Sequence, residues 1–258
     1  MIHSYNEWDH LREIVVGQAQ ALDHPDPNVI QEINQDLDDL CSILRDRGVT
    51  VHRAVGNDTS TLRIRDRLLV AGNTLIDPAV KDSRRERELE ALVPLLGETQ
   101  PVVMPRGKEL VMNATNVSRL GSTWLYLESS SGSRAAGEWL GDRFPDIDIH
   151  GCRFDGVMHI NQAMMVLGPS TIVLDSGLVK PDQLPRCLDN WQKIWVPNIQ
   201  GELLVITPDT VIADRVDTEL KLEIRNHGFN VVSHSLRHAT ELNTGIHLST
   251  LDLYRQPL

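Results

Sequence analysis

Cysteine is scarce in this chain, and its spacing excludes the usual structural roles of the residue. Only three cysteines occur among 258 residues, namely Cys41, Cys152 and Cys187. Their number is odd and they lie far apart, in none of the spacings of a zinc site or a disulfide framework. We therefore expect three reduced, buried thiols and no metal site.

Long hydrophobic runs, a leader segment and an excess of positive charge are also missing. No apolar run reaches the roughly 18–20 residues that span a bilayer. The first residues have neither the basic nor the apolar segment of a secretory signal. The net charge of -11 and an isoelectric point near 5.3 argue against a nucleic-acid or anionic-membrane partner. We expect a cytoplasmic protein.

Motifs of cofactor binding are absent from the sequence as well. It has no glycine-rich phosphate loop, no nucleotide fingerprint and no cluster of metal-ligating side chains, so we expect no cofactor. The apolar fraction of 41% is ordinary, and a chain of this length can bury a substantial core. A small-molecule substrate or ligand is the partner that these properties favour.

One unit recurs along the chain: a hairpin of two strands, then a helix, then a third strand. The predicted hairpins are Leu68–Asp77, Val117–Leu127, Met164–Asp175 and Leu203–Ala213. The helices that follow are predicted at Ser83–Leu96, Gly132–Arg143, Pro181–Trp191 and Asp217–Asn226. The third strands are predicted at Pro101–Met104, Ile147–Arg153, Lys193–Val196 and Asn230–His234. In the first hairpin, Gly72 and Asn73 suit the positive φ angles of a short turn.

The N-terminal stretch holds most of a fifth unit. It has a strand at Leu11–Gly17, a helix at Asn28–Arg47 with apolar residues at helical spacing, and a strand at Val49–His52. The first hairpin arm is missing, and a C-terminal strand at Gly245–Tyr254 could supply it. A repeat that closes on itself in this way is a propeller-like ring. We predict a single α/β domain over residues 1–258.

A closed ring of such units brings the hairpin tips and strand ends to its central axis, where polar residues can surround a small ligand. The candidates are Arg65, Asp66, Asn113, Asn116, Arg119, Met158, His159, Ile160, Asn161, His247, Leu248 and Ser249. Each has a structural interpretation too. A lone histidine such as His159 is more often a hydrogen-bonded structural residue than a catalytic one, and the two asparagines can cap turns. The pair Arg65-Asp66 is typical of a solvated or strand-capping ion pair.

Several stretches together resemble the glycine (arginine:glycine) amidinotransferase family of the guanidino-group-modifying, or pentein, superfamily. They are Ser4-Tyr-Asn-Glu-Trp-Asp-His-Leu-Arg-Glu-Ile-Val-Val-Gly17, Leu40–Val51, Arg65-Asp66 ahead of Leu68–Asn73, Met158-His159-Ile160, Ile224–Val231 and Gly245-Ile-His247. The resemblance covers nearly the whole chain, and the opening stretch and Met158-His159-Ile160 are its specific parts. It implies a five-bladed α/β propeller, the pentein fold, with the site on the axis.

The family's chemistry implies roles for particular residues. A cysteine thiolate attacks the guanidinium carbon of arginine, a histidine acts as general acid and base, and carboxylates bind the cation. The resemblance assigns the histidine to His159 and one carboxylate to Asp66. It assigns substrate binding to Asn116, Asn161, Arg119, Met158, His247 and Ser249.

Three positions depart from the family's pattern. The two further aspartates are Asn116 and Asn161, and the cysteine is Leu248. Leucine has no nucleophilic atom, so standard covalent amidino transfer is excluded at that position. Loss of two negative charges weakens the binding of a guanidinium, since each charge-assisted hydrogen bond contributes roughly 1.5–3 kcal/mol. An asparagine both donates and accepts, which suits a neutral ureido or amide group.

No replacement nucleophile stands out in the sequence. Ser249 follows Leu248 directly, and on a strand its side chain points to the opposite face of the sheet. Cys41 belongs to the buried face of a predicted helix. Cys152 ends a predicted strand just before Met158-His159, and Cys187 has no visible partner.

Three hypotheses follow from the sequence. The first is an amidinotransferase-like enzyme with altered, non-cysteine chemistry, in which His159 is general acid and base. The second is a catalytically inactive homologue that binds a ligand or serves as a partner subunit, in a homo-oligomer or beside an active paralogue. The third is an interaction module that uses the acidic surface and has no ligand on the axis.

Overall fold

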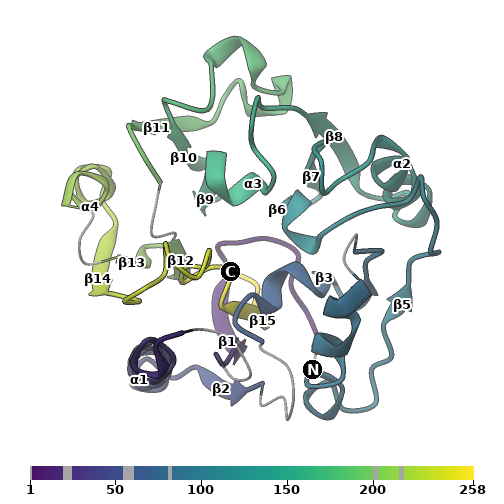
Figure 1. Ribbon diagram of the computed structural model, residues 1–258. Coiled ribbons are helices and arrows are strands. Elements are labelled where there is room, and N and C mark those ends of the chain that lie inside the picture. Colours follow the sequence, from purple (N-terminus) through teal and green to yellow (C-terminus); the bar gives the residue numbers. More distant parts are fainter. Residues whose placement is uncertain (1, 20–24, 55–60, 81–82, 200–202, 215–217) are drawn as a thin grey trace.

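Five small sheets form a ring around a central axis in the computed structural model, which describes residues 2–19, 25–54, 61–80, 83–199, 203–214 and 218–258 (Figure 1). Each sheet has three strands, and its central strand pairs antiparallel with one neighbour and parallel with the other. Figure 1 shows β15, β3, β6, β9 and β12 nearest the axis, with helices α1, α2 and α4 at the periphery. The prediction of an α/β five-bladed propeller is confirmed.

The strands follow the predicted repeat closely. The first sheet consists of β15 (Thr250–Gln256), β1 (His10–Val16) and β2 (Thr50–Arg53), and the second of β3 (Leu69–Ala71), β4 (Thr74–Asp77) and β5 (Val102–Val103). The third contains β6 (Val117–Leu120), β7 (Thr123–Leu127) and β8 (Asp148–Cys152), and the fourth β9 (Met164–Gly168), β10 (Thr171–Asp175) and β11 (Gln192–Val196). The fifth contains β12 (Leu203–Thr207), β13 (Thr210–Asp214) and β14 (Asn230–His234).

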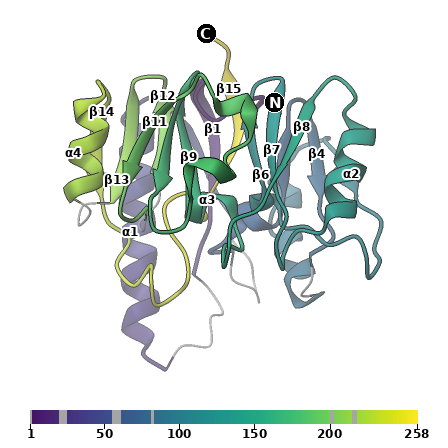
Figure 2. The same ribbon diagram turned by 90° about the horizontal axis from the view of Figure 1, so that it is seen from above.

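The two ends of the chain close the ring. Strand β15 pairs antiparallel with β1, in a register that runs from His10 opposite Gln256 to Val16 opposite Thr250. A bridge between His3 and Tyr254 extends this contact, and both ends of the chain lie on one face of the ring (Figure 2). The predicted missing hairpin arm is therefore supplied by the C-terminus.

Three α-helices cover the outside of the ring: α1 (Pro27–Arg45), α2 (Arg134–Arg143) and α4 (Thr218–Asn226). In α1, apolar side chains recur every three or four residues and are fully buried, as at Ile33, Leu37, Leu40 and Leu44. Asp217, the predicted first residue of the last helix, lies outside the described residues. None of the helices in the described ranges is long and apolar enough to cross a bilayer.

Two predicted helices are instead broken into short 3-10 turns. The segment predicted at Ser83–Leu96 forms η2 (Ser83–Leu89) and η3 (Val93–Leu95), and Pro94 lies in the first turn of η3. The segment predicted at Pro181–Trp191 forms η5 (Pro181–Gln183) and η6 (Arg186–Leu188). Proline removes a backbone donor and blocks continuation of an α-helix through it, so these segments cannot form one long helix.

The predicted closing strand begins later than expected. Strand β15 starts at Thr250, whereas Gly245–Ser249 form a turn. The Ser249 hydroxyl donates to the Gly245 carbonyl at 2.7 Å, and the Thr250 hydroxyl donates to the Ile246 carbonyl at 3.0 Å. Such bonds from serine and threonine side chains to the backbone four residues earlier compete with strand pairing.

The turn between β3 and β4 requires a glycine. Gly72 has a φ of 62°, as predicted, while Asn73 has no positive φ. A Cβ atom on Gly72 would lie 2.7 Å from the ring of Tyr5, so any larger residue would push the N-terminal segment away. This close approach lets Ser4 and Gly72 exchange two backbone hydrogen bonds of 2.9 Å.

Candidate functional site

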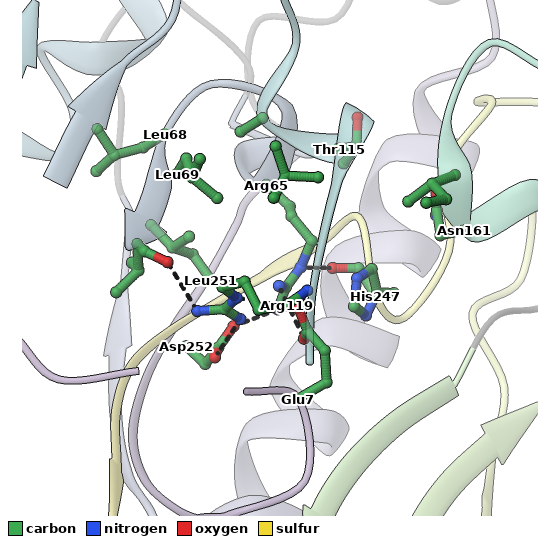
Figure 3. Close-up of a pocket in the computed structure, with 14 residues that line it drawn as sticks. Glu7, Arg65, Leu68, Leu69, Thr115, Arg119, Asn161, His247, Leu251 and Asp252 are labelled. Carbon is green, nitrogen blue, oxygen red and sulfur yellow. Dashed lines mark hydrogen bonds and ion pairs between the residues drawn. The ribbon is translucent and has the colours of Figure 1, made fainter. Parts of the chain in front are cut away.

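The axis of the ring is occupied by a network of buried charges. The two oxygens of Asp252 each lie 2.8 Å from a guanidinium nitrogen, one of Arg65 and one of Arg119. Arg119 also donates from Nε to Glu7 at 3.0 Å, and Arg255 pairs with Asp252 at 2.9 Å. All five residues are at most 8% exposed. Figure 3 shows four of them, all but Arg255, converging from different parts of the chain.

Backbone carbonyls accept hydrogen bonds from guanidinium N–H groups of Arg65 and Arg119 that do not reach the two carboxylates. Arg119 donates to the carbonyls of Ser4 at 3.2 Å and Val70 at 2.8 Å, and Arg65 donates to that of His247 at 2.9 Å (Figure 3). Because each contact joins a different segment, this network holds the inner ends of the blades together.

Two small cavities of about 20 Å³ each adjoin the charges, and both are lined by Glu7, Asn161 and His247. A volume of this size holds about one water molecule. Three of the predicted binding residues, Arg119, Asn161 and His247, thus lie at the axis among the buried charges.

His247 is neutral at this position. Burial and the nearby Arg65 guanidinium lower its pKa to about 3, against the opposing influence of Glu7 and Asp252. A protonated imidazole would add a fourth positive charge to three arginines that are balanced by only two carboxylates. His247 therefore belongs to the electrostatics of the axis as an uncharged group.

A second polar cluster surrounds His159, immediately before helix α3 (Ile160–Ala163). Its Nδ1 lies 3.7 Å from an oxygen of Asp66, and the same oxygen accepts a 2.6 Å hydrogen bond from the Thr115 hydroxyl. Its Nε2 lies 3.2 Å from the amide nitrogen of Asn113. The Asn113 amide and the Asp66 carboxylate therefore hold the two sides of the imidazole.

Asp66 is fully buried, and both of its oxygens are engaged. Its second oxygen accepts a 3.0 Å hydrogen bond from Arg85, whose guanidinium also pairs with Glu88. Burial alone would raise the pKa of Asp66, but the charges of His159 and Arg85 and the Thr115 hydroxyl outweigh it and lower the pKa. Asp66 is therefore ionised.

Asn116 connects three loops. Its amide nitrogen donates to the Leu127 carbonyl at 3.0 Å, to the Ser129 hydroxyl at 3.1 Å and to the Met158 carbonyl at 3.2 Å. Its oxygen accepts from the Asn113 backbone at 3.0 Å. These contacts engage both the amide nitrogen and the oxygen of Asn116 in links between the loops.

Met158 lies at the edge of an open groove beside this cluster. The groove has a volume of about 460 Å³ and is lined by residues that include Ser129, Gly132, Arg134, Arg153, Gly156 and Met158. The Met158 side chain is 49% exposed. It is the solvent-exposed member of the predicted site.

Leu248 and Ser249 lie in the turn before β15. Leu248 is 7% exposed, and its carbonyl accepts a 3.2 Å hydrogen bond from the Arg65 backbone. Ser249 is fully buried, and its hydroxyl donates to Gly245. Because these residues are not on a strand, the alternation argument for Ser249 is wrong, and the buried contact with Gly245 is what occupies its hydroxyl.

The three cysteines are free thiols. Cys41 and Cys152 are buried as expected, and burial raises the pKa of Cys152 to about 12. Cys187, in the short helix η6, is only partly buried, contrary to expectation. Raised pKa values, caused first by burial, disfavour the thiolate at all three positions.

The structure divides the predicted residues between two places. Asp66, His159, Asn116 and Met158 belong to the cluster beside the groove, whereas Arg119, Asn161 and His247 lie at the charged axis. Sequence reasoning missed the roles of Arg85, Thr115, Glu7 and Asp252. Arg85 and Glu88 are three residues apart, which is typical of a solvated helix pair, so their pattern gave no sign of a contact with Asp66.

Among the described residues, no group of three or more histidine, cysteine, aspartate or glutamate side chains could hold a metal ion. The cluster around His159 offers an imidazole, one ionised carboxylate, amides and hydroxyls. They can orient a small polar molecule and exchange protons with it.

Comparisons with known proteins place these features in context. No protein-family model matches the chain. It is 28% identical to a putative inosamine-phosphate amidinotransferase 2 of Streptomyces griseus, over 99% of this chain and 97% of that protein. It is 21% identical to the mitochondrial glycine amidinotransferase of Xenopus tropicalis, over 98% of this chain and 82% of that protein.

Solved structures agree with the sequence relatives. An inosamine-phosphate amidinotransferase of Streptomyces griseus superposes with a TM-score of 0.91 at 25% identity, covering 100% of this chain and 98% of that one. A dimethylarginine dimethylaminohydrolase of Pseudomonas aeruginosa, complexed with citrulline, superposes with a TM-score of 0.77 at 11% identity, covering 94% and 99%.

The ring of five sheets around a polar axis is the fold of the pentein superfamily. The sequence relatives named above are inosamine-phosphate and glycine amidinotransferases. The resemblance stated from the sequence is confirmed.

Proposed function

We propose that this chain is an amidinotransferase homologue that binds a neutral ureido or amide compound related to arginine, without transferring an amidino group through a covalent enzyme intermediate. The observation that carries the proposal is Leu248, a buried leucine where the resemblance places the nucleophilic cysteine. Without a thiolate there, no sulfur can hold the amidino group.

The charge of the cluster supports a neutral ligand. The resemblance places carboxylates at Asn116 in this cluster and at Asn161 on the axis, and the carboxylate of the cluster, Asp66, is already paired with Arg85. A guanidinium at the cluster would therefore meet no carboxylate that lacks a cationic partner. Citrulline, bound by the Pseudomonas aeruginosa relative, has the size and the neutral ureido group that amide donors and acceptors suit.

The position of His159 fits binding as well. Its Nε2 lies beside the Asn113 amide and its Nδ1 faces Asp66. An imidazole held on both sides has a defined orientation toward a ligand.

The first experiment tests both halves of the proposal. We expect no covalent label when the purified protein is incubated with guanidino-labelled arginine, quenched in acid and analysed by intact mass spectrometry. We expect citrulline to raise the melting temperature and arginine to raise it less, since the site lacks an uncompensated carboxylate. A covalent adduct on the unmodified protein would overturn the proposal, as would the absence of any shift with citrulline.

The matched variant is Leu248→Cys. We expect it to accumulate a covalent amidino adduct slowly, because His159 and Asp66 remain adjacent while the cation-binding charges are reduced. Leu248→Ser is the control, since a hydroxyl of ordinary pKa is a much weaker nucleophile and should give no adduct.

A second candidate function is hydrolysis without a covalent intermediate. The approach of His159 Nδ1 to Asp66, 3.7 Å, favours it, because a carboxylate that orients an imidazole is the usual arrangement of a general base. Conversion of citrulline or arginine to product that disappears in His159→Ala would support this function over binding alone.

A further inference from the structure

Arg85 places a guanidinium group of the chain itself against the site. Its Nη1 donates to Asp66 at 3.0 Å and its Nη2 to the Arg63 carbonyl at 3.2 Å. Its Nε and Nη2 donate to the two oxygens of Glu88 in a bidentate ion pair, both at 2.9 Å. This side chain is 13% exposed, and the carboxylate of Asp66 is fully buried.

Arg85 and His159 contact the same carboxylate, that of Asp66. One oxygen of Asp66 lies near His159 and accepts from Thr115, and the other oxygen accepts from Arg85. The guanidinium of Arg85 and the imidazole of His159 therefore lie on the two sides of one carboxylate. Two carboxylates that hold a planar cation in this way form a binding site for a guanidinium, and here the occupant comes from the same chain.

We propose that Arg85 is the residue that sets the charge of the ligand at this site: an internal guanidinium that satisfies Asp66 and limits the site to uncharged molecules. Removing it leaves Asp66 and Glu88 as a carboxylate pair that binds an external guanidinium cation. The first statement rests on the proposed binding function, whereas the second concerns only the carboxylate pair.

A merely structural role for Arg85 predicts a different outcome. In that case the ion pairs only hold helix η2 against the blade, and their loss lowers stability without creating a binding site. A small guanidinium compound then has no specific effect on the variant. Recovery of stability by such a compound separates the two roles, because it requires an empty, correctly shaped site.

The experiment is chemical rescue of Arg85→Ala by methylguanidine, followed by thermal unfolding. We expect the variant to melt roughly 10 °C below the unmodified protein, since Asp66 is left buried without its cation. We expect millimolar methylguanidine to restore at least half of that loss in a saturable manner, with no rise in the unmodified protein. The matched control is Arg47→Ala, which removes an exposed arginine that donates to the Ile43 carbonyl four residues earlier and should show neither loss nor rescue.

Two further variants keep the proposal open to refutation. Asp66→Asn combined with Arg85→Ala should lose the rescue, because one of the two carboxylates is gone. Arg85→Gln removes the charge and keeps a polar side chain at this position, so it serves if the alanine variant does not fold. Because Asp66 then has no arginine partner, we expect this variant to bind arginine at least tenfold more tightly than the unmodified protein does. A folded Arg85→Ala without rescue, rescue that persists in the double variant, or an Arg85→Gln protein with unchanged arginine affinity would each overturn the proposal.

The outcomes also separate this inference from the proposed function. Methylguanidine rescue without any citrulline binding by the unmodified protein would refute the proposed ligand and keep the carboxylate pair as a guanidinium site. Citrulline binding without rescue would refute the role of Arg85 and keep the proposed function.

Discussion

Asp252→Asn is expected to lower the free energy of unfolding by about 3–5 kcal/mol. Asp252 is fully buried and faces three arginines, Arg65, Arg119 and Arg255, at 2.8 to 2.9 Å. Burial would raise the pKa of Asp252, but Arg119, Arg65 and Arg255 hold it well below its usual range. Asparagine keeps the shape but removes the charge, so Glu7 alone would balance three buried guanidinium groups.

Urea unfolding followed by circular dichroism measures this effect, and the midpoint should fall without a change of slope if the denatured state is unaltered. Glu138→Gln is the matched control, because its pair with Arg134 lies four residues apart on an exposed helix surface. That change should cost no more than about 0.5 kcal/mol. A loss below about 1 kcal/mol in Asp252→Asn would mean that the axial charges do not hold the blades together.

Acid is expected to destabilise the fold well before the carboxylates titrate, because of His247. Its pKa is about 3 in the folded protein, against an ordinary value of 6.5, owing to burial and the charge of Arg65. Between these two values the unfolded chain binds a proton that the folded chain excludes. Stability is therefore fully present above pH 6.5 and falls as the pH decreases towards 3, by about 1.4 kcal/mol per pH unit.

The window from pH 6.5 to 4.5 isolates this histidine from the axial carboxylates, and the expected loss across it is roughly 2–3 kcal/mol. His247→Gln should flatten most of the slope. His234, whose pKa is lowered first by burial, leaves a smaller slope of the same sign, and His238, whose pKa is raised by Glu32, acts in the opposite sense near pH 6.5 and above. An unchanged slope in His247→Gln would show that the imidazole is not excluded from protonation by the axis.

The ring itself could be predicted because it depends on local patterns repeated five times. Each hairpin combines two short apolar runs with a turn. In the first hairpin the turn requires a glycine, because Gly72 has a positive φ and the ring of Tyr5 lies close to it. Pairing of the two chain ends followed from a missing hairpin arm in the first unit. The hairpins can be predicted without knowledge of distant contacts, whereas the closure of the ring depends on the pairing of β1 with β15.

Predictions failed where side chains or prolines overrode the pattern. The closing strand begins at Thr250 because the hydroxyls of Ser249 and Thr250 bond back to the preceding turn. The helix expected after the first hairpin is interrupted between Leu89 and Val93, just before Pro94 in the first turn of η3. In both cases a hydrogen bond or a missing donor, rather than apolar spacing, decides the local conformation.

By itself, the sequence determined the propeller and the closure of its ends, because hydrophobic periodicity and turn residues are local properties. Only the tertiary structure decided which buried charged side chains pair with one another. Arg65 and Asp66 are neighbours in the chain, yet Arg65 turns to Asp252 at the axis and Asp66 to Arg85 and His159. Buried charges require partners at close range, and which partners come within range depends on how distant segments meet in the folded ring.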